Sequence, residues 1–324
     1  MKTLLTGGIS QRNSRLIHGR HILSTAEIGL VDWETGSFSV ITTYTTPAKN
    51  RPEEVSSCTF GCATVQDGLL YTCTATEVLI YDLNTMARKA LISNQYFNDV
   101  HHARPINGRL YVASTGLDAV IQLDDDGEIE AMQNVLGKDV WCRLKEGGDY
   151  RKVVSTKPHE SHPNFLFELD GEPWVTRFNQ RDAVALNDNS RRISIDVERP
   201  HDGVVYGDHI YFTCVNGNIV IASRYSLEVE EVIDLNEIDA RGQPLGWCRG
   251  ICIEGDLAYV GFSKLRTTKL IENDQWVKAK LKPGSNEFNS LDSRVACYDL
   301  RKKELIKEVK IPPDSQSAIF SVVD

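Results

Sequence analysis

The sequence predicts an all-β protein, a six-bladed β-propeller made of four-stranded antiparallel blades. Three observations lead to this fold class. A strand–turn–strand unit recurs along the 324 residues, each full copy carries an aromatic residue just after a hairpin turn, and the copies number about six. A single sheet of four short strands cannot bury both of its faces. The copies must therefore pack against one another, and in closed form they give a propeller.

The clearest copy is the stretch VHHARPINGRLYVASTGLDAVIQLD, from Val100 to Asp124. Its Asn107-Gly108 pair is a strong hairpin signal. The alternating run from Leu110 to Ser114 has the pattern of a strand, Gly116 interrupts it, and Ala119 to Asp124 has the pattern of the next strand. This stretch alone supplies most of one four-stranded sheet.

The aromatic residue after the hairpin turn locates the other copies. It is Tyr71, Tyr111, Trp174, Tyr211 or Tyr259. A further copy opens the chain, where HGRHILSTAEIGLVDWETG follows the same pattern from His18 to Gly36. Together these make about six units, a number inside the usual range for propellers.

Closure of the ring requires an innermost strand for the first unit, and three segments could provide it: Lys2–Thr6, Arg12–Ile17 or Ala318–Val323. We favour Ala318–Val323, because a C-terminal strand would join the two ends of the chain and leave no unpaired sheet edge. The ring is then closed by the chain termini. We expect one domain over residues 1–324, with an insertion at 264–292 in the last blade.

Composition excludes several classes of protein. The formal net charge of -9 argues against a general nucleic-acid surface, because phosphate binding needs a basic face. No apolar run approaches the roughly 20 residues that cross a membrane, and the N-terminus has no signal-peptide pattern. We expect a cytoplasmic protein with no membrane partner. The eight cysteines are spread along the chain, which does not suggest a disulfide framework.

The innermost strands should carry the functional residues, because they line the channel and their starts surround one mouth of it. Counting ten residues back from the aromatic marker gives His101, His201 and Arg249. The same count reaches Gly61 in the Tyr71 copy. In the Trp174 copy, either Asn164 or His162 takes this position, and Arg12 takes it in the opening copy if Arg12–Ile17 is the inner strand.

Imidazole and guanidinium groups around one mouth suggest two chemistries. His101, His201 and Arg249 are the candidate catalytic residues, with a histidine moving a proton next to an arginine-bound carboxylate. His101, His162 and His201 are the candidate ligands of a divalent metal, which would be Zn, Mn or Fe. The candidate substrate-binding residues are the polar neighbours of these positions: His102, Arg104, Asn164 and Asp202.

Structural roles are open for the same residues. A histidine at a strand start can simply hydrogen-bond to a backbone carbonyl of the adjacent blade, and Arg104 and Arg249 can be salt-bridge partners between blades. The sequence has no Walker A loop, no dinucleotide-binding glycine motif, no HExxH and no Cys-x-x-Cys pair. Nucleotide binding and the common zinc sites therefore have no support.

Three segments carry a resemblance to a known family: HHARPINGRLYVASTGLDAVIQLD, PLGWCRGICIEGDLAYVGFSKLR and RVACYDLRKKELI, the last followed by AIFSVV. Together they resemble an uncharacterised bacterial family of predicted six-bladed propellers. The shared motif positions are His101, Arg104, Arg249, Gly250, Gly261, Ser263 and Arg266. The resemblance implies the fold and transfers no activity.

The sequence thus favours an enzyme that acts on a small anionic or sugar-derived substrate at the channel mouth. Histidine-mediated proton transfer, with or without a divalent metal, is typical of a lyase or isomerase, which we favour over a hydrolase. The alternative is a non-catalytic module that binds a protein or glycan partner, because propellers serve as enzymes and as scaffolds.

Overall fold

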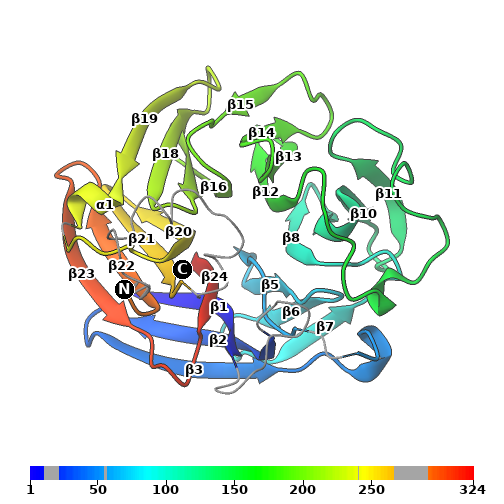
Figure 1. Ribbon diagram of the computed structural model, residues 1–324, viewed down its shortest axis with the longest axis horizontal. Coiled ribbons are helices and arrows are strands. Elements are labelled where there is room, and N and C mark those ends of the chain that lie inside the picture. Colours follow the sequence, from blue (N-terminus) through cyan, green and yellow to red (C-terminus); the bar gives the residue numbers. More distant parts are fainter. Residues whose placement is uncertain (11–21, 55–56, 240, 266–290) are drawn as a thin grey trace, which may run out of the picture.

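Six four-stranded antiparallel sheets form a closed ring in the computed structural model (Figure 1). The structure describes residues 1–10, 22–54, 57–239, 241–265 and 291–324. The predicted six-bladed β-propeller is confirmed. The expectations for Arg12, for Arg266 and for most of the 264–292 insertion lie outside the described residues.

Blades are numbered here from the one that holds the N-terminus. The innermost strands of blades 1 to 6 are β24 (Ala318–Val323), β4 (Thr64–Gln66), β8 (Val100–Ile106), β12 (Pro163–Leu169), β16 (Pro200–Tyr206) and β20 (Trp247–Glu254). The second strands are β1 (Lys2–Ser10), β5 (Leu69–Cys73), β9 (Arg109–Ser114), β13 (Glu172–Arg177), β17 (His209–Cys214) and β21 (Leu257–Ser263).

The outer half of each blade follows the same order. The third strands are β2 (Leu23–Asp32), β6 (Val78–Asp82), β10 (Ala119–Leu123), β14 (Asp182–Ala185), β18 (Asn218–Ser223) and β22 (Arg294–Asp299). The outermost strands are β3 (Ser37–Tyr44), β7 (Arg88–Ile92), β11 (Ile129–Asn134), β15 (Arg192–Ser194), β19 (Val229–Asp234) and β23 (Glu304–Lys310). In the described part of the chain, four short helices lie in the connections between strands: η1 (Ala48–Asn50), η2 (Thr115–Leu117), η3 (Tyr150–Lys152) and α1 (Leu235–Ile238).

Ring closure uses the C-terminal segment, as the sequence predicted. Strand β24 pairs antiparallel with β1, and Leu4 lies opposite Val323 in the register. On its other side β24 is tied to blade 6, because the backbone N–H of Ile319 donates to Ser263 Oγ at 2.8 Å. The first blade is thus completed by the last strand of the chain.

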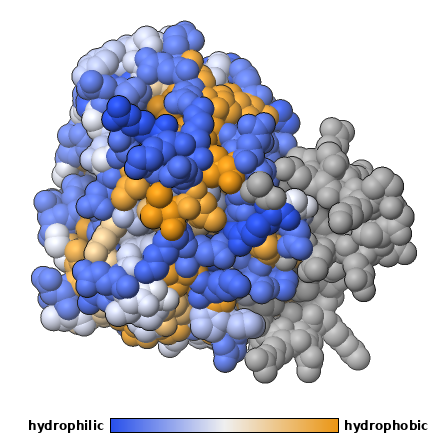
Figure 2. Space-filling model, turned by 90° about the vertical axis from the view of Figure 1, so that its left-hand side faces the viewer, coloured by the Kyte–Doolittle hydropathy of each residue, from blue (hydrophilic) through white to orange (hydrophobic). Residues whose placement is uncertain are grey.

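The core lies between neighbouring blades. For example, Phe167 of blade 4 packs on Trp174 of the same blade and on Phe212 of blade 5, with ring centroids 5.8 and 6.0 Å apart. Of the aromatic markers, Trp174 is fully buried and Tyr259 nearly so, whereas Tyr71, Tyr111 and Tyr211 are partly buried. The view onto the side of the ring that carries β19 and β23 is largely hydrophilic, with apolar residues between the polar ones (Figure 2). No helix among the described residues is long and apolar enough to cross a membrane.

A β-bulge interrupts the inner strand at the same place in most blades. The register shifts at this place in β8, β12, β16, β20 and β24. A bulge leaves its extra residue unpaired and turns that side chain out of the sheet's alternation. A bulged residue can therefore leave the alternation of the sheet, as His101 does in β8 and Phe320 does in β24.

Candidate functional site: a histidine cluster at the channel mouth

His101, His201 and Arg249 occupy equivalent positions in three blades. Each lies three residues before the inner-strand residue that pairs with the aromatic marker, as shown by the pairs Arg104–Tyr111, Val204–Tyr211 and Cys252–Tyr259. In blade 1 the equivalent residue is Phe320, at the bulge of β24. This corrects the alignment that gave Arg12 this position, because the inner strand of blade 1 comes from the other end of the chain.

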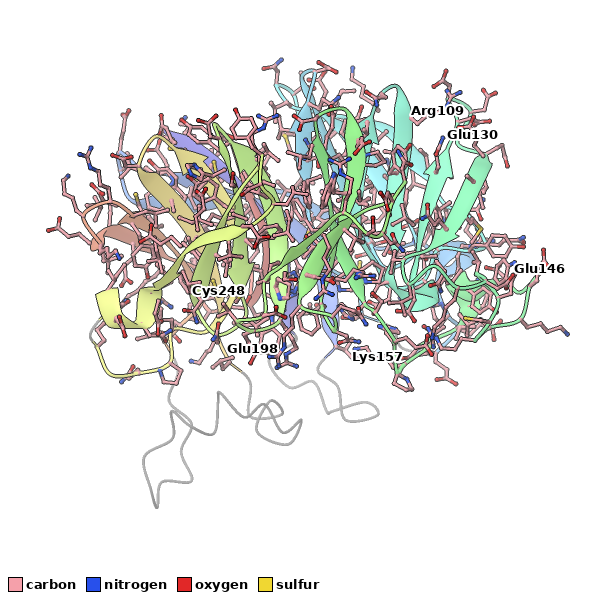
Figure 3. The ribbon with its side chains drawn as sticks, turned by 90° about the horizontal axis from the view of Figure 1, so that it is seen from above. Arg109, Glu130, Glu146, Lys157, Glu198 and Cys248 are labelled. Atoms are coloured by element: carbon pink, nitrogen blue, oxygen red, sulfur yellow. The ribbon has the colours of Figure 1, made fainter. Side chains whose placement is uncertain are left out.

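The loops before the inner strands lie on one face of the ring. Figure 3 shows Lys157 and Glu198, which precede β12 and β16, on one face, with Arg109 and Glu130 toward the opposite face. The first of these loops carries His159 and His162, and the second carries Arg199. The side chains described below gather on this face.

The hydrogen bond of His101 defines its tautomer. Its Nδ1 lies 2.7 Å from the backbone oxygen of Asp99. A carbonyl oxygen can only accept, so Nδ1 carries the proton and Nε2 carries the lone pair. Burial holds the pKa of His101 below its usual value, and the Arg249 guanidinium lowers it further while Asp99 opposes both. His101 is therefore a neutral imidazole that offers its Nε2 as a base.

His162 reaches the same state through a relay. The Thr156 hydroxyl donates to the Gly116 carbonyl at 2.6 Å, so it accepts from His159 Nε2 at 3.3 Å. His159 Nδ1 is then the acceptor of a 3.2 Å hydrogen bond from His162 Nδ1. This assignment leaves the lone pair of His162 on Nε2. The His162 ring packs edge-on to His101, with centroids 4.7 Å apart.

Asp118 positions the loop that carries the two histidines. Its side chain is 2% exposed and accepts hydrogen bonds from the backbone N–H groups of residues 160, 161 and 162 at 2.9–3.0 Å. The Arg143 guanidinium balances the carboxylate charge at 2.9 Å. His162 itself has a φ of 63°, a strained backbone conformation that this set of bonds supports.

His201 completes the imidazole group from blade 5. It is 2% exposed, and its Nδ1 has no hydrogen-bond partner among the described residues. Phe178 lies between it and His162, with ring centroids 5.5 and 4.8 Å away. Burial holds the pKa of His201 well below its usual value, and Arg249 and His101 lower it further. The pKa of His162 is also well below its usual value because of burial and three neighbouring imidazoles, and burial lowers the pKa of His159 to about 4.

Two arginines line the cluster, each between aromatic rings. The Arg249 guanidinium lies 4.1 Å from the ring centroid of Phe320 and 5.7 Å from that of Trp247. Arg199 lies 5.8 Å from the Trp247 ring and 5.2 Å from the Phe178 ring. Flat aromatic faces hold guanidinium groups in place, and Arg199 Nε also lies 3.2 Å from Glu198 Oε1. The mouth therefore combines neutral imidazoles with fixed positive charge.

The structure gives His102 a different position from His101. It is fully buried between blades, stacked on Phe165 at 4.2 Å. Its Nδ1 accepts from the Leu166 N–H, and its Nε2 donates to Thr64 Oγ1, both at 2.9 Å. Burial lowers its pKa to about 3. Both ring nitrogens hold blades together, so we remove His102 from the substrate-binding set.

Asn164 and Asp202 also connect blades. Asn164 is the bulged residue of β12, is fully buried, and donates to the Pro200 carbonyl at 2.8 Å. The Asp202 carboxylate accepts from Gly250 N at 2.9 Å and from the Thr213 hydroxyl, and burial raises its pKa to about 7. Arg104 is partly buried opposite Tyr111, and burial lowers its pKa while Glu168 opposes this. Asn164 and Asp202 thus tie neighbouring blades together, Asp202 also interacts electrostatically with Arg249, and a substrate-binding role for Asn164, Asp202 and Arg104 stays a prediction.

The predicted metal site has suitable donor atoms but, among the described residues, lacks the arrangement that a metal ion needs. The available nitrogens of His101, His162 and His201 are suitable donors for Zn, Mn or Fe. However, no group of three or more His, Cys, Asp or Glu side chains in the described part of the chain is arranged to hold a metal ion. We therefore derive no chemical step through a metal.

Sequence reasoning missed the aromatic members of the cluster. The count cannot reach Phe320, because the second strand of its blade, β1, lies at the other end of the chain. No local sequence pattern marks Phe178 as a member of the cluster. It belongs to the turn after β13, and only the arrangement of the blades brings it to His162.

Comparison with known proteins supports the fold. No protein-family model and no curated protein matches the sequence. A crystal structure of a protein of unknown function from Bacteroides caccae is similar, with a TM-score of 0.60, 11% sequence identity, and coverage of 99% of this chain and 97% of that chain. A chain in a crystal structure of a nidogen/laminin complex has a TM-score of 0.58 and 9% identity, with coverage of 99% and 97%. At such identities the likeness shows the propeller fold alone, and the resemblance to a bacterial family stays a prediction.

Proposed function

We propose that this propeller is an enzyme that binds a small anionic or sugar-derived substrate at the histidine cluster and moves a proton with His101. The observation that carries the proposal is the hydrogen bond from His101 Nδ1–H to the Asp99 carbonyl at 2.7 Å. It fixes the tautomer with Nε2 as the base, and desolvation keeps the ring neutral. A neutral, oriented imidazole is what general base catalysis requires.

Arg249 supplies the second requirement of the mechanism. Its guanidinium is held against the Phe320 ring on one side of the cluster, and its charge acts on both His101 and His201. A substrate carboxylate bound there would make a neighbouring C–H more acidic. His101 Nε2 would take that proton, and His162 Nε2 is a second base 4.7 Å away, measured between ring centroids. Return of that proton to the carbon makes the reaction an isomerisation, whereas its transfer from His101 to a departing β-substituent makes it an elimination, the reaction of a lyase.

A non-catalytic alternative has a specific observation in its favour. One similar structure comes from a nidogen/laminin complex, so a related fold is found in a protein complex. The protein would then bind a protein or glycan partner on the same face without catalysing a reaction. Both functions use the cluster, and they differ in whether a proton moves.

Proton exchange in D₂O separates the two. We would incubate the protein with a panel of α-hydroxy acids, uronates and sugar acids, and follow deuterium incorporation next to the carboxylate by NMR. We expect His101→Gln to slow the exchange by at least about 100-fold, the usual size of a general-base contribution. The control is His209→Ala, which removes an exposed histidine paired with Glu230. Binding of a panel member without exchange in the parent protein would refute the catalytic proposal.

A further inference from the structure

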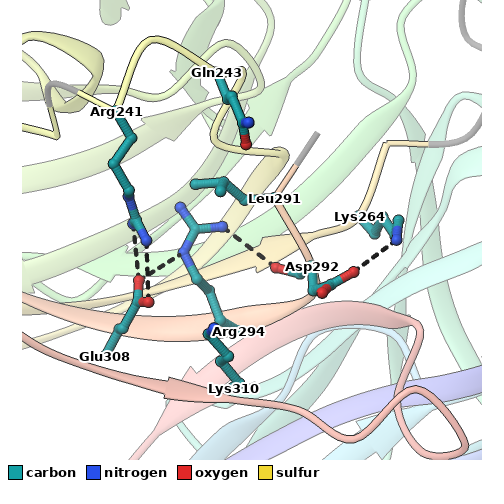
Figure 4. Close-up of a pocket in the computed structure, with 8 residues that line it drawn as sticks. All are labelled: Arg241, Gln243, Lys264, Leu291, Asp292, Arg294, Glu308 and Lys310. Atoms are coloured by element: carbon teal, nitrogen blue, oxygen red, sulfur yellow. Dashed lines mark hydrogen bonds and ion pairs between the residues drawn. The ribbon is translucent and has the colours of Figure 1, made fainter. Parts of the chain in front are cut away.

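A pocket lies in blade 6 and shares no residue with the histidine cluster. Its volume is about 220 Å³, and its charged lining residues are Arg241, Lys264, Asp292, Arg294, Glu308 and Lys310. Figure 4 shows the Arg294 guanidinium between Glu308 and Asp292, with Gln243 nearby. The pocket therefore gathers four cationic side chains in a protein whose net charge is -9.

Most of these charges are already paired. Arg241 contacts Glu308 at 2.8 Å and also pairs with Asp239, which lies behind the pocket. Lys264 pairs with Asp292 at 2.6 Å. Even with Asp239 included, four cations meet three carboxylates. The pocket keeps an excess of positive charge.

Arg294 is the buried member of this set. It is 1% exposed and lies over the Phe262 ring, with its Cζ 4.5 Å from the ring centroid. Its Nη1 donates to the Leu245 carbonyl at 2.6 Å. Its Nη2 has no hydrogen-bond partner among the described residues, and the carboxylate of Asp239 is 3.9 Å away. A buried N–H group without an acceptor is unfavourable, and more so when the group is charged.

Lys310 lines the same pocket as Arg294. It pairs with Arg294 in the register of β22 and β23, so the two side chains leave the same face of the sheet. It is exposed, and no ion pair or hydrogen bond joins its ammonium to another described residue. One fixed guanidinium donor and one mobile ammonium thus meet at the pocket.

We infer that the blade 6 pocket binds an oxyanion, a phosphate or carboxylate group, between Arg294 and Lys310. Such groups accept the charge-assisted hydrogen bonds that these two side chains offer. The volume is below the roughly 300–1,000 Å³ of ordinary ligand pockets, which restricts the occupant to a small anion or the charged end of a larger molecule. This site does not depend on the proposed function of the histidine cluster.

Titration calorimetry of the full chain tests the inference, with inorganic phosphate and succinate as separate probes. We expect saturable binding with a Kd of millimolar order that weakens with added salt. Lys310→Ala should weaken anion binding at least about fivefold. Arg294→Lys keeps the charge but loses the paired N–H donors of the guanidinium, so it should weaken binding further. Binding of phosphate alone or succinate alone identifies the kind of oxyanion that the pocket takes.

Two controls separate this site from other effects. Lys303→Ala removes the same charge from the far end of the β22–β23 hairpin, where Lys303 pairs with Glu231, and should leave binding within about twofold of the parent. His101→Gln should also leave it intact, because that residue belongs to the channel mouth. The inference is overturned if neither anion binds, or if Lys310→Ala and Lys303→Ala have equal effects. Since Lys310 is exposed, its variant remains informative even if Arg294→Lys does not fold.

Discussion

His101 and His102 are adjacent in the chain, yet their hydrogen bonds give them different roles. His101 gives its Nδ1 proton to a carbonyl and keeps a free lone pair, whereas His102 uses both ring nitrogens between blades. The bulge in β8 separates them, because it turns His101 out of the sheet and leaves His102 inside. Sequence alone shows two equal imidazoles.

This contrast predicts different costs of removal. His102→Ala deletes two hydrogen bonds and a stacked ring from a fully buried site, so the free energy of unfolding should fall by about 3 kcal/mol or more. His101→Gln loses one hydrogen bond at the mouth and should cost about 1 kcal/mol. Urea denaturation of both variants measures the difference. Equal losses would mean that the two side chains have the same structural role.

Asp202 should make stability depend on pH. Its pKa is raised to about 7 by burial, so between about pH 4 and 7 the folded state holds a proton that the unfolded state has lost. Stability from this group is greatest below pH 4 and falls as the pH rises, by about 1.4 kcal/mol per unit. Asp202→Asn removes this loss, because an amide oxygen still accepts from Gly250 N–H and the Thr213 hydroxyl.

The measurement is the difference in unfolding free energy between Asp202→Asn and the parent at pH 5 and pH 8. We expect the variant to gain about 2–3 kcal/mol relative to the parent over that range. The buried histidines act in the opposite direction, because their lowered pKa values reduce stability below about pH 6.5. They are common to both proteins and cancel in the difference. A difference that does not vary with pH would contradict the raised pKa.

At the scale of the elements, the inner-strand bulges change which side chains follow the alternation of the sheet. Alternation and turn signals predicted the strands, because those patterns are local. The bulges could not be predicted in the same way, since they depend on pairing with the next strand. For this reason the count found His101, His201 and Arg249, yet it did not show that Asn164 and Asp202 are tied to the neighbouring blade.

Gly250 tests the bulge of β20. Its φ is +79°, and an added Cβ would lie 2.8 Å from the backbone of Ser321 in blade 1. Gly250→Ala should therefore lower the unfolding free energy by about 2 kcal/mol or more. The matched control is Gly255→Ala. Its φ is +60° and no atom lies within 4 Å of an added Cβ, so this variant measures the conformational cost without a steric clash. If both variants lost the same stability, the close approach of β24 to this bulge would be unsupported.

At the scale of the whole molecule, the ring brings together residues that are distant in the chain. The repeat predicted the number of blades, and the need to avoid a free edge predicted the closing strand. The cluster itself draws on blades 1, 3, 4, 5 and 6, through Phe320, His101, His162, His201 and Arg249. The contacts of Phe178 and Arg199 were not predictable, because no local pattern relates one blade's loop to the next.

Closure by β24 makes a final prediction. Deletion of residues 318–324 leaves β1 with an unpaired edge and removes the fully buried Ile319 and the almost fully buried Val322 from the space between blades 1 and 6. It also removes Phe320 from the mouth. Burial of these side chains and the paired backbone together approach the 5–15 kcal/mol that usually separates folded from unfolded chains. We expect the shortened chain to lose its cooperative thermal transition, as followed by circular dichroism.

The matched control is deletion of Asp324 alone, which keeps every register pair between β24 and β1 and should melt like the parent. A peptide of residues 312–324, added in trans, should restore the transition of the shortened chain, because an open sheet edge accepts an extended strand through main-chain hydrogen bonds. Restoration would also return Phe320 to Arg249, so proton exchange by the cluster should reappear with it. A shortened chain that melts at the parent temperature would show that the ring does not need its terminal strand.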